Sequence, residues 1–139
     1  SLRSMNSSSD GLTDRAELTI GLRLPLDCDP AALAAAISAL AGNATLQFRD
    51  GCRAYQGERN TPLVRTFLRA IRANGGTPGF LLKTGTSDMN VVGPAWRCPI
   101  LAYGPGDSAL DHTPDEHIVI AEYLRAIDIL SLALRGLAA

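Results

Sequence analysis

Hydrophobic and polar positions along the chain follow two different periods, which predict strands and helices in turn. From Ala16 to Leu26, leucine and isoleucine alternate with polar residues or glycine, and this period of two predicts a half-buried strand. Residues 44–55 alternate again around the Asp50-Gly51 turn, which predicts a hairpin or a bulged strand. Short apolar runs at 80–83 and 99–103 suit buried strands that run directly into loops.

Three segments between and after these runs have the spacing and the caps of helices. Asp29-Pro30 places a capping side chain before a favoured first helical residue, and it predicts a helix of about three turns. Thr61-Pro62 opens a second helix, which Asn74-Gly75-Gly76 ends. Thr113-Pro114-Asp115-Glu116 has the pattern of a capping box. It predicts a long C-terminal helix that lies on a sheet.

Strands that alternate with helices predict an α/β fold class. Residues 1–15 are rich in serine, asparagine and aspartate, which favour turns, so this segment is predicted to be a loop. The first predicted strand then has no partner before it in the sequence. We therefore expect part of the fold to precede Ser1.

Composition and charge disfavour several classes of partner. The chain has 139 residues, 46% of them hydrophobic, and its net charge of -1, with acids and bases nearly equal, gives no electrostatic footprint for nucleic acid and no polybasic stretch for a membrane surface. No apolar run approaches the roughly 18 residues that span a bilayer, and the polar start lacks the apolar centre of a signal peptide. A cytoplasmic protein is expected. Its three cysteines, Cys28, Cys52 and Cys98, are far apart and odd in number, so we expect reduced thiols.

The loop Thr84-Gly85-Thr86-Ser87-Asp88-Met89-Asn90 follows one of the predicted strands and concentrates polar groups. Backbone N–H groups and hydroxyls match the carboxylate of an amino-acid ligand, and Asp88 matches its amine. The alternative is a well hydrogen-bonded turn, because Ser, Asp and Asn are common turn residues.

A second loop, residues 104–112, follows the next predicted strand and ends in Asp111-His112. A histidine backed by a carboxylate can present a neutral ring nitrogen to a metal. The alternative is that His112 is a cap or a surface residue, with Glu116 and His117 on the exposed start of the helix. A thiol hydrolase using Cys98 with His112 has little support, because no nucleophile elbow or oxyanion loop surrounds Cys98.

Three strings, Lys83–Asn90, Ala102–Ser108 and Leu110–Ile118, resemble the closing motifs of the dimetal aminoacylase, carboxypeptidase and deacetylase superfamily of zinc metallopeptidases. They are most similar to its acetyl-lysine and acetylornithine deacetylase branch. That branch includes a hydrolase that releases lysine or ornithine from an amino-group carrier protein. More weakly, Leu18–Pro25 resembles a strand of the family's lid domain, and Thr61–Val64 its re-entry into the catalytic domain.

The resemblance implies two domains and a metal site. Residues 1–57 would be the second half of a ferredoxin-like lid, which often mediates dimers, and residues 58–139 the C-terminal part of a mixed-sheet α/β catalytic domain. His112 would bind one of two Zn²⁺ or Co²⁺ ions. The residues expected to position the substrate are Gly85, Thr86, Ser87, Asp88, Asn90, Gly104, Gly106 and Ser108.

The implied function is metal-dependent hydrolysis of a linear amide bond in lysine or arginine biosynthesis. The substrate would be acetyl-lysine, acetylornithine, or lysine or ornithine on the carrier protein, and the enzyme would be a cytoplasmic homodimer. The family's other metal ligands and its glutamate base have no counterpart in the chain, so no catalytic residue is assigned and the isolated chain is expected to be inactive. The alternative is a non-catalytic interaction or regulatory module.

Overall fold

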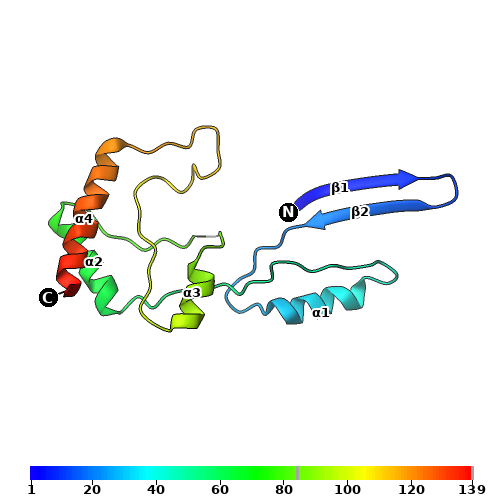
Figure 1. Cartoon of the computed structure of the whole chain (residues 1–139), viewed down its shortest axis with the longest axis horizontal. Helices are drawn as coiled ribbons and strands as arrows, with labels where there is room; N and C mark the ends of the chain where they lie inside the picture. The colour runs from blue at the N-terminus through cyan, green and yellow to red at the C-terminus, as the bar shows by residue number, and fades with distance from the viewer. Residues whose placement is uncertain (84, 139) are drawn as a thin grey trace. The chain divides into compact units, whose positions relative to one another are not determined.

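The computed structural model describes residues 1–83 and 85–138, and these residues combine one two-stranded sheet with four helices (Figure 1). This mixture of strands and helices confirms the predicted α/β class. The chain divides into two compact units, Ser1–Arg53 and Ala54–Ala139. In the described part of the chain, no helix is both long enough and apolar enough to cross a bilayer.

The first unit begins with an antiparallel hairpin of β1 (Leu2–Ser9) and β2 (Asp14–Ile20). At its turn, the Asp10 carboxylate accepts hydrogen bonds from the N–H groups of Leu12 (2.9 Å) and Thr13 (2.7 Å). The prediction of a loop over residues 1–15 was wrong, and so was the inference that the first strand lacks a preceding partner. Cross-strand hydrogen bonding along β2 outweighs the turn preference of serine and asparagine in β1.

The rest of the first unit contains α1 (Pro30–Leu40), as predicted from its cap. The Asp29 carboxylate accepts hydrogen bonds from the N–H groups of Ala31 (2.7 Å) and Ala32 (3.2 Å), and it also pairs with Arg53. The predicted hairpin or bulged strand over residues 44–55 was wrong, because these residues contain no strand. Among the described residues the only ladder joins β1 to β2, so this alternating segment has no strand partner.

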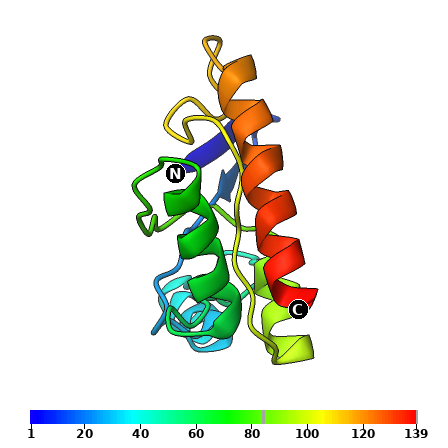
Figure 2. The same cartoon turned by 90° about the vertical axis from the view of Figure 1, so that its left-hand side faces the viewer.

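The core of the second unit lies between α2 (Pro62–Ala73) and α4 (Ile120–Ala138), which lie side by side (Figure 2). The predicted start of α2 is confirmed, since the Thr61 hydroxyl accepts a hydrogen bond from the Val64 N–H at 3.2 Å. At its end, Gly75 has a φ of 73°, a conformation that glycine tolerates well. The buried cluster consists of Phe67, Ala70, Ile129 and Ala133.

The C-terminal helix differs from its prediction in both its start and its partner. It begins at Ile120, because the expected cap residues form a turn instead: the Thr113 hydroxyl donates to the Leu110 carbonyl (2.7 Å), and Glu116 accepts from the His112 N–H (2.8 Å). The helix packs on α2 and not on a sheet, because its small and apolar residues fit the apolar face of α2.

The two predicted buried strands, at 80–83 and 99–103, are not strands in the structure. A strand needs a neighbouring edge to satisfy its backbone groups, and the described ladder involves only β1 and β2. A further helix, α3 (Met89–Trp96), was not predicted. Its sequence contains Gly93 and Pro94, which both have low helix propensity.

Candidate functional site

The loop before α3 is held together by its own polar groups. Asn90 accepts a hydrogen bond from the Ser87 N–H through its side-chain Oδ1 (3.0 Å), and its own N–H donates to the Ser87 carbonyl (3.0 Å). Asp88 occupies the cap position of α3, but its carboxylate makes no capping hydrogen bond, and the residue is exposed. Thr84 lies outside the described residues. Hydrogen bonds between Ser87 and Asn90 therefore hold the loop, and the Asp88 carboxylate does not cap helix α3.

A cavity of about 310 Å³ opens beside this loop. Its polar end is formed by Ser87 and Asp88, both expected from the sequence to bind substrate. Its apolar wall comes from the start of α3 and from the segment before Tyr103. The residues that line it are Ser87, Asp88, Met89, Val92, Ile100, Leu101 and Ala102. The arrangement can receive a small molecule with a polar head and an apolar chain.

The segment beneath this cavity is anchored to the helical core. Leu101 packs against the buried cluster, and the Tyr103 ring lies 5.1 Å from the Phe67 ring, centroid to centroid. Partial burial raises the pKa of the Tyr103 phenol above its ordinary value, because it disfavours the charged phenolate. The wall of the cavity is thereby fixed to α2. Sequence reasoning treated this wall only as a buried strand.

The second loop is formed by successive turns. The Asp107 carboxylate accepts a hydrogen bond from the Ala109 N–H (2.9 Å), and Gly106 has a φ of 98°, a region that strains residues other than glycine. Of the residues expected to contact substrate, Gly104, Gly106 and Ser108 are exposed and do not line the cavity at Ser87. In the described structure Ser87, Asp88 and Asn90 lie together in the first loop, whereas the three residues of the second loop do not join them at the cavity.

His112, the expected metal ligand, is exposed and has a φ of 65°. Its backbone is fixed by the hydrogen bond to Glu116 described above. The neighbouring carboxylate of Asp111 pairs with Lys83 at 2.7 Å. Its hydrogen bond is with Lys83, and its interaction with His112 is electrostatic, a smaller cause of the lowered pKa of Asp111. His117 is also exposed, and its Nδ1–H donates to the Asp115 carbonyl at 2.7 Å.

The ion pair of Lys83 with Asp111 joins the two loops across 28 positions of sequence. The Lys83 ammonium, hydrogen-bonded to Asp111, holds the pKa of that carboxyl below its ordinary range. Sequence reasoning did not assign this pair a role. One signal was present in the sequence, because Lys83 is the only lysine of the chain beside twelve arginines.

A metal site needs several donors that converge on one point. Within residues 1–83 and 85–138, no group of three His, Cys, Asp or Glu side chains is placed to hold a metal ion. His112 by itself supplies one nitrogen. The described residues therefore do not form a complete metal site, and Cys28, Cys52 and Cys98 are free thiols.

Comparison with known proteins gives a family and several named relatives. The model of peptidase family M20/M25/M40 matches residues 7–136. A LysW-lysine hydrolase of Deinococcus radiodurans is 52% identical over 138 residues, which is 98% of this chain and 38% of that protein. The LysW-lysine/LysW-ornithine hydrolase of Saccharolobus islandicus is 36% identical over 78 residues, 56% of this chain and 22% of that protein.

A Thermococcus kodakarensis protein, provisionally named a LysW-lysine/LysW-ornithine hydrolase, is 58% identical over 81 residues. That match covers 58% of this chain and 24% of the relative. The chain thus spans less than half of the length of the curated relatives it matches. The family match covers nearly all of the described residues, including the loops that hold Asp88 and His112. The chain belongs to peptidase family M20/M25/M40.

Proposed function

We propose that the chain is part of a hydrolase that cleaves the amide bond between an amino-group carrier protein and lysine or ornithine. The observation that carries this proposal is the 52% identity, over 98% of the chain, to a LysW-lysine hydrolase. The relatives from Thermococcus and Saccharolobus are also named as hydrolases of LysW-lysine or LysW-ornithine. Such an enzyme would serve lysine or arginine biosynthesis in the cytoplasm. Acetyl-lysine and acetylornithine are the corresponding small substrates.

The proposed work of this chain is to position the substrate and to supply one metal ligand. Ser87 and Asp88 are placed at the polar end of a cavity of about 310 Å³, which supports a role in holding an amino acid. Asn90 supports Ser87 through the hydrogen bonds described above. We assign backbone or hydroxyl contacts with substrate to Gly85 and Thr86, and to Gly104, Gly106 and Ser108 of the second loop.

A metal-bound water whose pKa falls towards neutrality is the nucleophile that Zn²⁺ or Co²⁺ supplies to such enzymes. We propose that His112 is the one ligand from this chain. The remaining donors and the general base then come from the longer protein, since this chain spans 38% of the Deinococcus relative. We also propose that residues 1–57 belong to a lid through which two copies pair, and residues 58–139 to the catalytic domain. The division of the chain after Arg53 supports a boundary in this region.

The proposal is tested on the full-length enzyme with lysine attached to its carrier protein. His112→Ala should lower kcat/KM by at least about 100-fold and lower the bound metal per chain, because a ligand to the metal is lost. His117→Ala is the matched control, since His117 is also exposed but is not assigned to the metal. If the metal-loaded wild-type enzyme cleaves neither the carrier conjugate nor the acetylated amino acids, the alternative of a non-catalytic module is correct.

A second experiment tests Asp88 as the counter-charge for the substrate. Asp88→Asn keeps the shape and removes the charge, so loss of an ion pair should cost roughly 2 to 4 kcal/mol, or about 30-fold to 1000-fold in kcat/KM. Acetyl-norleucine, which lacks the side-chain amine, should be affected far less than acetyl-lysine. Equal losses on both substrates, together with a lower melting temperature, would assign Asp88 to the scaffold of the loop.

A further inference from the structure

Helix α2 has an exposed face made of three arginines, Arg65, Arg69 and Arg72, which we call the arginine face. They stand four and three positions apart and so share one side of the helix. The helix contains no acidic residue. Like charges at this spacing destabilise a helix, and Arg65 in addition stands close to the positive N-terminal end of the helix dipole. The arginine face is therefore electrostatically unfavourable for the helix that carries it.

Its neighbour α4 shows the ordinary arrangement. There Glu122 and Asp128 stand three positions on either side of Arg125, so charges of opposite sign alternate along the helix. Helix α2 itself offers the arginine face no such compensation. The ion pairs of Asp29 with Arg53 and of Lys83 with Asp111 involve none of its three arginines.

The arginines make only neutral contacts that leave most of their donors open. Arg65 donates to the side-chain oxygen of Asn60 at 2.7 Å, and Arg69 donates to the Thr66 hydroxyl at 3.4 Å. A guanidinium has five N–H groups arranged to bind a carboxylate with two of them at once. The arginine face can therefore bind external carboxylates without breaking either of the ion pairs named above.

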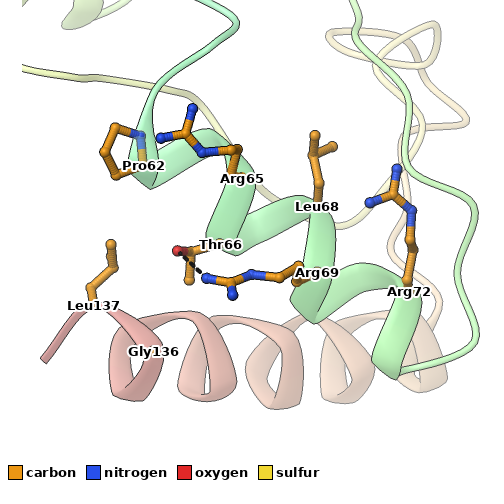
Figure 3. Close-up of a pocket in the computed structure, with 8 residues that line it drawn as sticks. All are labelled: Pro62, Arg65, Thr66, Leu68, Arg69, Arg72, Gly136 and Leu137. Atoms are coloured by element: carbon orange, nitrogen blue, oxygen red, sulfur yellow. Dashed lines mark hydrogen bonds between the residues drawn. The ribbon is translucent and has the colours of Figure 1, made fainter. Parts of the chain in front are cut away.

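The arginine face borders a cavity of about 560 Å³ where the end of α4 meets the start of α2 (Figure 3). Pro62, Leu68 and Leu137 add apolar surface to its lining. At the bottom of the lining, Gly136 allows close contact between the helices, since a Cβ on it would lie 3.2 Å from the Thr66 methyl carbon. The result is an open groove that is both cationic and apolar.

We propose that this groove docks an acidic, amphipathic helical segment of a partner protein. At a rise of 1.5 Å per residue, the backbone positions of Arg65 and Arg72 lie about 10 Å apart, so the arginine face spreads its three charges along about two turns of the helix. A helix with carboxylates at the same spacing can meet all three arginines, and leucines beside them can enter the apolar lining. None of the groove residues belongs to the loops assigned to substrate and metal. The inference is therefore independent of the proposed hydrolysis.

Binding is measured on the full-length protein with a fluorescein-labelled helical peptide that has glutamates at positions i, i+4 and i+7 and leucines between them. A peptide of the same composition with scrambled order serves as the probe control. The ordered peptide should bind at least about tenfold more tightly than the scrambled one, and its affinity should fall as salt is raised. The triple variant Arg65→Gln, Arg69→Gln, Arg72→Gln should lose at least about tenfold in affinity.

A matched variant, Arg97→Gln, Arg125→Gln, Arg135→Gln, removes the same charge from the same unit at residues that do not line the groove. It should bind the peptide like the wild type. Replacement of the three groove arginines by lysine keeps the charge and should restore part of the affinity, which separates docking from misfolding. Equal loss in both glutamine variants, no binding at all, or tighter binding of inorganic tripolyphosphate than of the peptide would overturn the proposal.

Discussion

The two units of the chain are stabilised in different ways. In Ser1–Arg53 no residue is buried, and its order comes from the hairpin ladder, the Asp10 turn and the capped helix α1. In Ala54–Ala139 the structure rests on side chains of α2 and α4 that are distant in sequence and meet in a buried cluster. Local hydrogen bonds shape the first unit and burial of apolar surface shapes the second. Substitutions of the same type should therefore act differently in the two units.

The largest difference is expected between the two phenylalanines Phe67 and Phe48. Phe67 is 8% exposed in the second unit, whereas Phe48 is 52% exposed in the first. Phe67→Ala should lower the free energy of unfolding by about 3–5 kcal/mol, because it leaves a cavity in the core. Phe48→Ala should change it by about 0.5 kcal/mol or less. Urea unfolding followed by far-UV circular dichroism reports on both units, and the fluorescence of Trp96, the only tryptophan, reports on the second. Equal effects of the two substitutions would contradict the comparison.

Added volume should distinguish the units in the same way. A Cβ on Gly93 would lie 2.3 Å from the Tyr55 ring, so Gly93→Ala should cost about 1–3 kcal/mol through overpacking. In the first unit, a Cβ on Gly51 would meet Pro30 at an ordinary 3.6 Å, and Gly51→Ala should be tolerated. Melting temperatures measure both variants. Partial rescue of Gly93→Ala by a second change, Tyr55→Leu, would identify the ring as the obstacle.

Loss of a helix cap should cost a similar free energy in either unit, but the effect should extend over different parts of the chain. Thr61→Ala and Asp29→Ala each remove an acceptor from the first turn of a helix, at a cost of about 1 kcal/mol, and Asp29→Ala also removes the ion pair with Arg53. Because α2 forms the core of its unit, loss of the Thr61 cap should shift the unfolding midpoint seen by Trp96. Loss of the Asp29 side chain should speed amide exchange in α1 and around Arg53, within the first unit. A shift of the Trp96 midpoint by Asp29→Ala would show that the units are coupled.

The smallest expected effect is the pH dependence of the hairpin turn. Hydrogen bonds from the Leu12 and Thr13 N–H groups lower the pKa of Asp10 below its ordinary value. Because the folded state favours the carboxylate, its contribution is complete above the unfolded pKa of about 4 and is lost as the pH falls through the lower folded pKa. Nuclear magnetic resonance shifts of the turn amides should report this loss. Asp10→Asn, which does not titrate, should remove the pH dependence.

Local signals predicted the parts of the fold that depend on neighbouring residues. The Asp29 and Thr61 caps, each followed by proline, mark the starts of α1 and α2 because the capping bonds reach only two or three residues ahead. The same kind of signal at Thr113 was wrong. There the hydroxyl donates to the Leu110 carbonyl, and Glu116 bonds the His112 N–H in a turn, which a residue pattern does not distinguish from a helix cap.

Within the candidate site, the sequence indicated which residues carry the chemistry but not how they are connected. The loop with Ser87 and Asp88 was identified from its composition and its family resemblance. Its apolar wall at Ile100–Ala102 and its link through Lys83 to Asp111 depend on contacts between distant segments. A single ion pair across 28 positions leaves no periodic pattern in a sequence. The lone lysine was the only available sign of it.

The sequence by itself determined the helix starts at Pro30 and Pro62, the mixed α/β class and the family, because these depend on local capping and on motif strings. Tertiary structure decided which apolar runs became ordered elements. The runs at 80–83 and 99–103 have strand character but no neighbouring edge in the described chain, whereas the polar segment Leu2–Ser9 is a strand because β2 lies beside it. A strand forms only when another segment hydrogen-bonds to its backbone, so the sequence of one segment does not by itself decide whether it becomes a strand.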